Sequence, residues 1–403
     1  MTEAVEVNGR SYRLPRGRSA VFCLDGCDPA YLEDAFDRSL VPRLSELADG
    51  GAYVLGRSQL PSFTNPNNLS IVTGAPPSVH GLPGNHYLAD DGSEVQLVDP
   101  AFLRCPSIHS AVAAAGVPVL AVTTKDKLRR LLAAGGVPCV SAEHADEQAI
   151  DGIPRVSDLV GRPKPGIYDW DCSHYALELG LAIADRLDTQ LLYVSLTDFV
   201  QHADPPGGEL SDRYLVYLDE LVGLYLDAGW KLALVADHGM NAKTGADGSP
   251  NVRYLGDFLE ANGIEAQVIL PITDPYVVHH AALGSACWVH VSDHDREQAR
   301  TLIAAQDGVE EVLGREEAAA QLSLPADRIG DLVVLADART ALGRRRAEHD
   351  LSSLRGPLRS HGGRHEQSVP ILLSERPDAD GKALLDRGAS NADVHRLLLG
   401  TAP

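Results

Sequence analysis

Five short apolar runs, each ending abruptly in polar or glycine-containing residues, constrain the fold of this chain more than any other feature. Each run is rich in Val, Leu and Ile and is nearly continuous, which favours parallel strands buried on both faces. Helix-like stretches separate them, and residues 41–51 end in a glycine pair typical of a helix C-terminus. The sequence therefore predicts an α/β fold whose mostly parallel sheet is covered by helices on both faces. The five runs are 20–24, 117–122, 191–196, 232–236 and 369–373.

Residues 251–345 have a different pattern and predict a small α+β insertion domain placed before the last core strand. Strand-like and helix-like segments alternate there, and no metal-ligand pattern accompanies them. The pair His279–His280 has no carboxylate cluster beside it, so we expect it to be structural or interfacial. The core then consists of residues 1–250 and 346–403. The strand-like segments are 266–272, 286–291, 309–314 and 331–337, and the helix-like ones are 257–263, 295–308 and 315–322.

The charge balance restricts the partners of the protein. The 403 residues include 35 Lys and Arg against 56 Asp and Glu, a formal net charge of −21. Such a surface repels nucleic acid and anionic lipid, so we expect neither as a partner. No apolar run approaches the roughly 18 residues of a membrane helix, and the first residues lack the apolar segment of a secretory signal. The six cysteines form no C-x-x-C pair, so a cytoplasmic protein with reduced thiols is expected.

Three aspartates follow buried strands, and two of them have histidine companions. Asp25 follows the run 20–24, Asp198 follows 191–196 with His202 four residues later, and Asp237 follows 232–236 with His238 next to it. Ligands of open α/β sheets bind beyond the carboxyl ends of the strands. Carboxylates gathered there would repel one another unless cations neutralised them. Oxygen and nitrogen donors without thiolate suit hydrolytic zinc and do not exclude Mn or Fe.

Thr64 is the candidate nucleophile. It precedes Asn65–Pro66 and a helical run, so its side chain is expected near a helix N-terminus, where free N–H groups attract anions. A threonine at that position is ordinarily an N-cap. Beside a metal ion, its hydroxyl can instead lose its proton and act as a nucleophile. The residue alone does not decide between these two roles.

Lys125 and Lys127 form the candidate anion-binding pair, directly after the run 117–122. In an extended segment, residues two apart point the same way, so both ammonium groups would face one ligand. A solvated surface turn is the alternative that spacing alone allows.

The motifs that carry these residues resemble the alkaline phosphatase superfamily. VFCLDG, PSFTNPNNLSIVTGAPPSVHGLPGN, TDFVQHAD, ADHGM and SHGG occur in the order that superfamily uses. The resemblance is greatest to its nucleotide pyrophosphatase/phosphodiesterase and phosphonoacetate hydrolase branch. The whole chain, including the insertion near 251–345, looks like the phosphonoacetate hydrolases.

The resemblance implies two Zn²⁺ per chain. One zinc would be held by Asp198, His202 and a late histidine, for which the sequence offers His361 and His365. The family places this ligand immediately before a glycine and about nine residues ahead of the next strand, which favours His361. The second zinc would be held by Asp25, Thr64, Asp237 and His238.

The resemblance also implies the reaction, hydrolysis of the C–P bond of phosphonoacetate to acetate and phosphate through a phosphothreonine intermediate on Thr64. The residues expected to bind this small anionic substrate are Thr64, Asn85, Lys125, Lys127 and His202. A nucleotide pyrophosphatase/phosphodiesterase or another phosphate-ester hydrolase is the alternative with the same metal set. A metal-dependent binding protein without catalysis is a further alternative, and a homodimer is suggested by family analogy alone.

Overall fold

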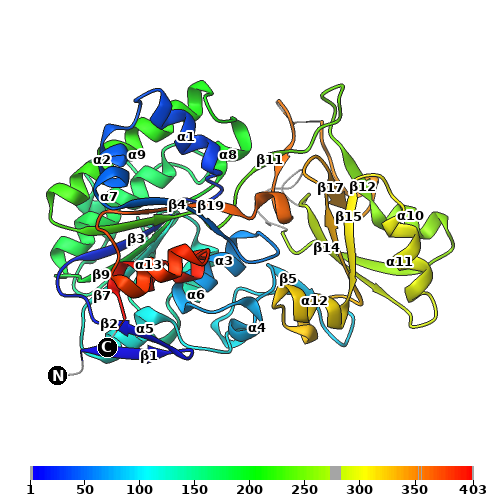
Figure 1. Cartoon of the computed structure of the whole chain (residues 1–403), viewed down its shortest axis with the longest axis horizontal. Coiled ribbons are helices and arrows are strands. Elements are labelled where there is room, and N and C mark those ends of the chain that lie inside the picture. The colour runs from blue at the N-terminus through cyan, green and yellow to red at the C-terminus, as the bar shows by residue number, and fades with distance from the viewer. Residues whose placement is uncertain (1–2, 273–282, 353, 355, 402–403) are drawn as a thin grey trace.

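The computed structural model describes residues 3–272, 283–352, 354 and 356–401, and the pair His279–His280 lies outside them. Its larger part is built on a seven-stranded sheet of order β4-β19-β10-β3-β9-β7-β8 (Figure 1). The five predicted runs all form strands of this sheet. The strands are β3 (Ser19–Cys23), β4 (Ala52–Arg57), β7 (Val119–Thr123), β8 (Cys139–Ser141), β9 (Leu191–Ser195), β10 (Lys231–Val235) and β19 (Ser368–Leu373).

The sheet is mostly parallel, as predicted. Strands β10, β3, β9, β7 and β8 pair in parallel, whereas β19 pairs antiparallel with both β10 and β4. The apolar run of β19 is as continuous as those of its parallel neighbours, because continuity reports burial on both faces and not strand direction. Sequence analysis did not predict β4, of whose six residues only one is buried, or the three-residue β8.

Helices cover both faces of this sheet. Successive side chains of a strand point to opposite faces, so Phe22 belongs to one hydrophobic cluster and Val21 to another. The cluster of Phe22 includes residues of α1 (Pro29–Asp37), α2 (Pro42–Gly50), α7 (Cys172–Arg186) and α9 (Glu209–Asp227). The cluster of Val21 includes residues of α3 (Thr64–Thr73), α5 (Ile108–Ala114), α6 (Asp126–Leu132) and α14 (Val394–Leu399), with α13 (Ala379–Asp386) packed against it. The two layers lie above and below the sheet in Figure 1.

A second sheet, four-stranded and antiparallel, forms the other part of the molecule (Figure 1). Its order is β13-β14-β16-β15, and it forms the small α+β unit that the 251–345 pattern predicts. The boundaries at 251 and 345 themselves stay a prediction. Its strands are β13 (Ala266–Ile269), β14 (Ala286–Val291), β15 (Val309–Gly314) and β16 (Leu332–Ala336), and its helices are α10 (Leu255–Ala261), α11 (Arg296–Ala304) and α12 (Arg315–Leu322).

One hydrophobic cluster joins the two parts. Leu60 and Phe63, which precede α3, pack in the same buried cluster as Ile269 of β13 and Trp288 of β14. The segment before Thr64 is therefore part of the core of the smaller unit. The shorter elements are β1 (Ala4–Val7), β2 (Arg10–Arg13), α4 (Pro77–His80), β5 (His86–Leu88), β6 (Glu94–Gln96), α8 (Phe199–Ala203), β11 (Asn241–Ala242), β12 (Val252–Tyr254), β17 (Ala341–Gly343) and β18 (Arg359–Ser360).

Among the helices of the described residues, none has the length and apolar character needed to cross a membrane.

Candidate metal centre

The three predicted aspartates meet at one edge of the larger sheet. Asp25 and Asp237 each lie two residues beyond the ends of β3 and β10, and Asp198 lies three residues beyond β9. Strand β3 pairs with both of the other strands, so the three ends are adjacent. All three side chains are buried. The topology therefore concentrates three carboxylates where α/β folds bind ligands.

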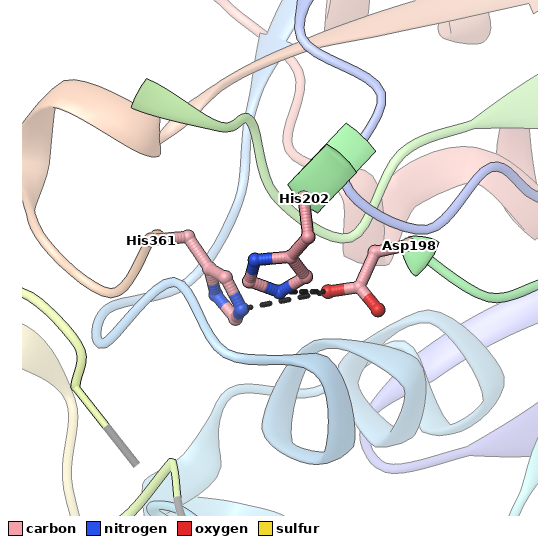
Figure 2. A group of neighbouring side chains, drawn as sticks. All are labelled: Asp198, His202 and His361. Carbon is pink, nitrogen blue, oxygen red and sulfur yellow. Dashed lines mark ion pairs between the residues drawn. The ribbon is translucent and has the colours of Figure 1, made fainter. Parts of the chain in front are cut away.

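Asp198, His202 and His361 form the first group of candidate ligands (Figure 2). The distance from His202 Nε2 to Asp198 Oδ2 is 3.0 Å, and that from His361 Nε2 to the same oxygen is 3.7 Å. Asp198 occupies the N-cap position of α8 without making a capping hydrogen bond, which leaves its carboxylate directed to the histidines. The other candidate, His365, is exposed and pairs with Glu310 at 3.1 Å. Of the two late histidines, the structure brings His361 to the cluster.

The second group is formed around His238. Ligand atoms of Asp25, Asp198 and His238 lie within 4.8 Å of one another. His238 Nε2 is 3.3 Å from Asp25 Oδ1 and 3.7 Å from Asp237 Oδ2. The rings of His238 and His361 stack, with centroids 3.6 Å apart and an interplanar angle of 6°. The two groups are therefore in contact and share Asp198.

Backbone carbonyls orient all three histidines. Nδ1 of His202, His238 and His361 lies 2.8, 2.9 and 2.8 Å from the carbonyl oxygens of Arg359, Gly239 and Ser62. A carbonyl accepts only from N–H, so these contacts assign the proton to Nδ1. With Nδ1 donating to a carbonyl, each ring directs Nε2 toward carboxylate oxygens, an arrangement that a cation between them would stabilise. The donor set of imidazole nitrogen and carboxylate oxygen fits zinc.

Burial and mutual repulsion dominate the electrostatics of the cluster. Burial, with the charges of Asp198 and Asp237, raises the pKa of Asp25 well above its ordinary value, and burial also raises the pKa of Asp237. Burial opposes the charge of His238, but Asp237 and Asp25 raise its pKa to about 10. Negative charge in this cluster thus attracts positive charge, as a cation site requires.

The carboxylate of Asp237 is held by partners that sequence analysis missed. The backbone N–H groups of Gly26 and His238 donate to Oδ1 at 3.1 and 3.0 Å, and Asn68 Nδ2 donates to Oδ2 at 3.2 Å. Asn68 also donates to the carbonyl of Thr64 at 3.0 Å and accepts from Tyr193 Oη at 2.7 Å. The four-residue spacing from Thr64 to Asn68 on one helix was the only sequence signal for this link.

Thr64 is the first residue of α3, and Phe63 is its N-cap. The ordinary N-cap role considered for Thr64 is therefore wrong. Its Oγ1 lies instead 3.2 Å from His238 Nε2. Between residues 60 and 75, Thr64 is the one side chain that is not buried. Thr64 is thus a partly exposed residue whose hydroxyl lies at the edge of the second group of candidate ligands.

The two lysines are placed differently from each other. Lys125 Nζ lies 3.6 Å from Asp198 Oδ1, so its ammonium group is beside the first group of candidate ligands. Helix α6 begins at Asp126, so Lys127 lies in its first turn and the expectation of an extended segment is wrong. The Lys127 Nζ atom is buried. Burial, assisted by the charge of Lys127, lowers the pKa of His86 to about 4.

Asn85 contacts the smaller unit. Its backbone N–H donates to the carbonyl of Pro271 at 2.6 Å, and its Nδ2 donates to that of Ile272 at 3.4 Å. The expected contact of Asn85 with a phosphoryl oxygen stays a prediction. These hydrogen bonds place Asn85 where the two parts of the molecule meet.

Comparison with known proteins agrees with this architecture. The type I phosphodiesterase / nucleotide pyrophosphatase family matches residues 19–365. Ectonucleotide pyrophosphatase/phosphodiesterase family member 1 of Mus musculus is 26% identical over 265 residues, 59% of this chain and 25% of that protein. The chain thus spans about a quarter of the length of the curated relatives it matches.

Two solved structures extend the comparison. Phosphonoacetate hydrolase from Sinorhizobium meliloti 1021, solved with phosphonoacetate and with phosphonoformate, is 41% identical, with 100% of both chains covered and a TM-score of 0.92. Murine ectonucleotide pyrophosphatase / phosphodiesterase 5, at 15% identity, 96% coverage of both chains and a TM-score of 0.62, has the same fold. The chain therefore belongs to the type I phosphodiesterase / nucleotide pyrophosphatase family of hydrolases, within the alkaline phosphatase superfamily.

Proposed function

We propose that this protein is a di-zinc hydrolase that cleaves the C–P bond of phosphonoacetate to give acetate and phosphate. The observation that carries the proposal is the placement of two groups at the candidate metal centre. The hydroxyl of Thr64 contacts His238, and the ammonium of Lys125 contacts Asp198. The groups proposed as the nucleophile and as the cation for the substrate carboxylate would thus lie beside the proposed metal ligands. The full-length similarity to a phosphonoacetate hydrolase solved with phosphonoacetate supports this substrate.

The residues present fit two zinc ions. Asp198, His202 and His361 would hold one ion, and Asp25, Asp237, His238 and the Thr64 oxygen would hold the other. When bound, zinc lowers the pKa of an attached hydroxyl or water and stabilises negative charge on phosphoryl oxygens.

The proposed reaction begins at Thr64. After the Thr64 hydroxyl has given its proton to water, Oγ1 forms a bond to phosphorus as the P–C bond breaks, and the bonding electron pair passes to the methylene carbon. The adjacent substrate carboxylate delocalises this charge, and a proton from water completes acetate. Water then attacks the phosphorus of phosphothreonine, which releases phosphate and restores the hydroxyl. The position of Thr64 at the start of α3 favours the negative charge of the attacking oxygen.

Lys125 and Lys127 would serve the leaving group. A carbanion is a poor leaving group unless its charge delocalises, and a cation beside the carboxylate stabilises the enediolate form as it develops. Interactions that strengthen toward the transition state raise the rate in addition to supporting binding. We therefore propose that the pair serves both recognition and catalysis. This role would also explain why two lysines lie so close in sequence in a chain whose net charge is −21.

The test is phosphate release from phosphonoacetate by the wild type and by Thr64→Ala, with zinc content measured in both. We expect two zinc ions per wild-type chain, loss of turnover on chelation, and no turnover by Thr64→Ala with zinc still bound. Wild-type turnover by Thr64→Ala would rule out the nucleophile. Active wild-type preparations with barely any zinc would rule out the metal mechanism.

A nucleotide pyrophosphatase or phosphodiesterase is the second candidate, favoured by the family match itself. It uses the same metal ligands, so they do not discriminate. A nucleobase pocket is usually lined by aromatic side chains, and only 5% of this chain is aromatic. We therefore expect the catalytic efficiency to be higher on phosphonoacetate than on a bis-aryl phosphate, with phosphonoformate as the close analogue. The reverse order would select the second candidate. The cytoplasmic location and the homodimer stay predictions.

A further inference from the structure

We propose that Arg359 is a positioning residue that fixes the spacing of His202 and His361 and thereby the affinity of the zinc they would share. The inference rests on the proposed function, because it concerns the metal centre of that function. It adds a residue to which neither the resemblance nor the motifs assign a role.

The backbone of Arg359 already links the two histidines. Its carbonyl oxygen lies 2.8 Å from His202 Nδ1 and fixes the ring so that Nε2 faces Asp198. Arg359 also stands two residues before His361, in β18, and its partner in the β11–β18 pair is Ala242. Any displacement of residue 359 therefore moves the hydrogen-bond acceptor of one candidate ligand and the chain that carries the other.

The side chain of Arg359 holds this backbone in place. Its Nε donates to the carbonyl of Gln201, the residue before His202, at 2.7 Å. Its Nη2 donates to Tyr31 Oη at 3.1 Å and lies 3.5 Å from the carbonyl of Met240. One guanidinium thus reaches α8, α1 and the segment that follows His238. Arg359 contacts the segment of His202 through both its side chain and its own carbonyl.

The chemistry of this contact requires arginine. The residue is only 6% exposed, and burying a charge is costly unless hydrogen bonds compensate. A planar guanidinium offers five donors in a fixed fork, whereas lysine offers one rotatable ammonium group. Lysine at 359 could keep the charge but could not reach Gln201 and Tyr31 from the same geometry. Outer partners that orient metal-bound histidines commonly change metal affinity about 10- to 100-fold.

The chain offers a matched control in Arg328. Its Nη1 donates to the carbonyls of Gly81 and Phe102 at 2.6 and 2.8 Å, so it is also an arginine that joins separate segments through backbone oxygens. Neither of these hydrogen bonds involves a candidate ligand. Arg328→Met should therefore lower thermal stability without changing zinc affinity.

The experiment compares wild type, Arg359→Met, Arg359→Lys and Arg328→Met in the zinc-loaded form. Each is dialysed against a series of chelator concentrations, and zinc per chain and circular dichroism are measured. We expect wild type and Arg328→Met to release their two ions at the same chelator concentrations. Both Arg359 variants should release one equivalent at a concentration at least tenfold lower. The visible spectrum of the Co²⁺-substituted protein should change in the Arg359 variants and not in Arg328→Met.

Release curves and Co²⁺ spectra that match wild type in a folded Arg359 variant would overturn the inference. If Arg359→Met does not fold, Arg359→Lys, which keeps the charge and most of the stem, decides by the same two measurements. Wild-type protein that binds no zinc would instead refute the proposed function. The failure of the inference and the failure of the function on which it rests are thus distinguished.

Discussion

Replacing His361 should remove zinc-linked stabilisation that replacing His365 leaves intact. His361 is 3% exposed, its Nδ1 contacts the carbonyl of Ser62, and its Nε2 faces Asp198. His365, four residues later, is exposed and pairs with Glu310, and such surface pairs contribute about 0–1 kcal/mol. Glutamine at 361 keeps much of the ring volume and can still donate to Ser62. Comparing His361→Gln with His365→Gln therefore measures the contribution of the His361 Nε2 atom to zinc binding.

The expected size follows from binding linkage. Zinc bound to the native state stabilises it by RT ln(1 + [Zn]/Kd), so a 100-fold loss of affinity costs about 2.7 kcal/mol at zinc well above both Kd values. Losing a direct ligand should reduce zinc affinity at least as much as losing a residue that only orients a ligand. The upper end of that second effect is about 100-fold. With an unfolding entropy of about 2.1 cal/mol/K per residue, 403 residues give about 0.85 kcal/mol/K. The zinc-induced rise in Tm should therefore shrink by about 3 °C.

The assay is differential scanning calorimetry of each protein with chelator and with excess zinc, alongside zinc content by elemental analysis. The difference within each variant cancels any packing defect left by the lost ring. We expect His361→Gln to show the reduced zinc effect and about one zinc per chain, and His365→Gln to match wild type. An undiminished zinc effect in His361→Gln, or a diminished one in His365→Gln, would refute the assignment of the late ligand.

Three further predictions concern other parts of the structure. Lys125→Met and Lys127→Met should each reduce phosphate release from phosphonoacetate at least tenfold more than hydrolysis of an activated aryl phosphate ester, because only the first reaction needs a stabilised carbanion; equal losses on both substrates would count against the role. Lys243→Met should lower the free energy of unfolding by about 3–5 kcal/mol in urea titrations, because it leaves Glu366 buried without the ammonium that lies 2.7 Å away; a loss below about 1 kcal/mol would contradict this. Burial lowers the pKa of His80 to about 3, so the unfolded state, with an ordinary pKa of about 6.5, takes up the proton first and stability falls as the pH falls from 6.5. The contribution of His80 to this loss is about 3 kcal/mol by pH 4, and the stability of His80→Gln should be correspondingly less sensitive between pH 7 and pH 4; an unchanged pH dependence would contradict the assignment.

The core strands could be predicted from the sequence because strands buried on both faces consist of uninterrupted apolar runs. The same reasoning could not give the direction of β19, since strand direction depends on how the chain returns to the sheet. It also missed β4, where three of the six residues are half-buried, two are exposed and the apolar pattern is weak. Lys127 was expected in an extended segment and lies in the first turn of α6, because lysines two apart fit both conformations.

The candidate ligands were predictable because metal-binding side chains and their motifs are local in sequence. The residues that orient them were not, because they act through backbone groups. Arg359 contacts His202 by its carbonyl, and Asn68 joins Asp237 to the backbone of Thr64. Such contacts depend on how distant segments are placed, and the residue types involved would suit many surface positions equally well.

The shared packing of Phe63 and Trp288 has an evolutionary consequence. A change of side-chain size inside the smaller unit would displace Phe63 and, through the backbone, the next residue, Thr64. Selection could thereby adjust the reactivity of the hydroxyl while every metal-binding side chain is retained. Libraries of variants aimed at Ile269 and Trp288 would be a direct route to altered turnover, and grafting the smaller unit from a relative would require Leu60 and Phe63 to be exchanged with it.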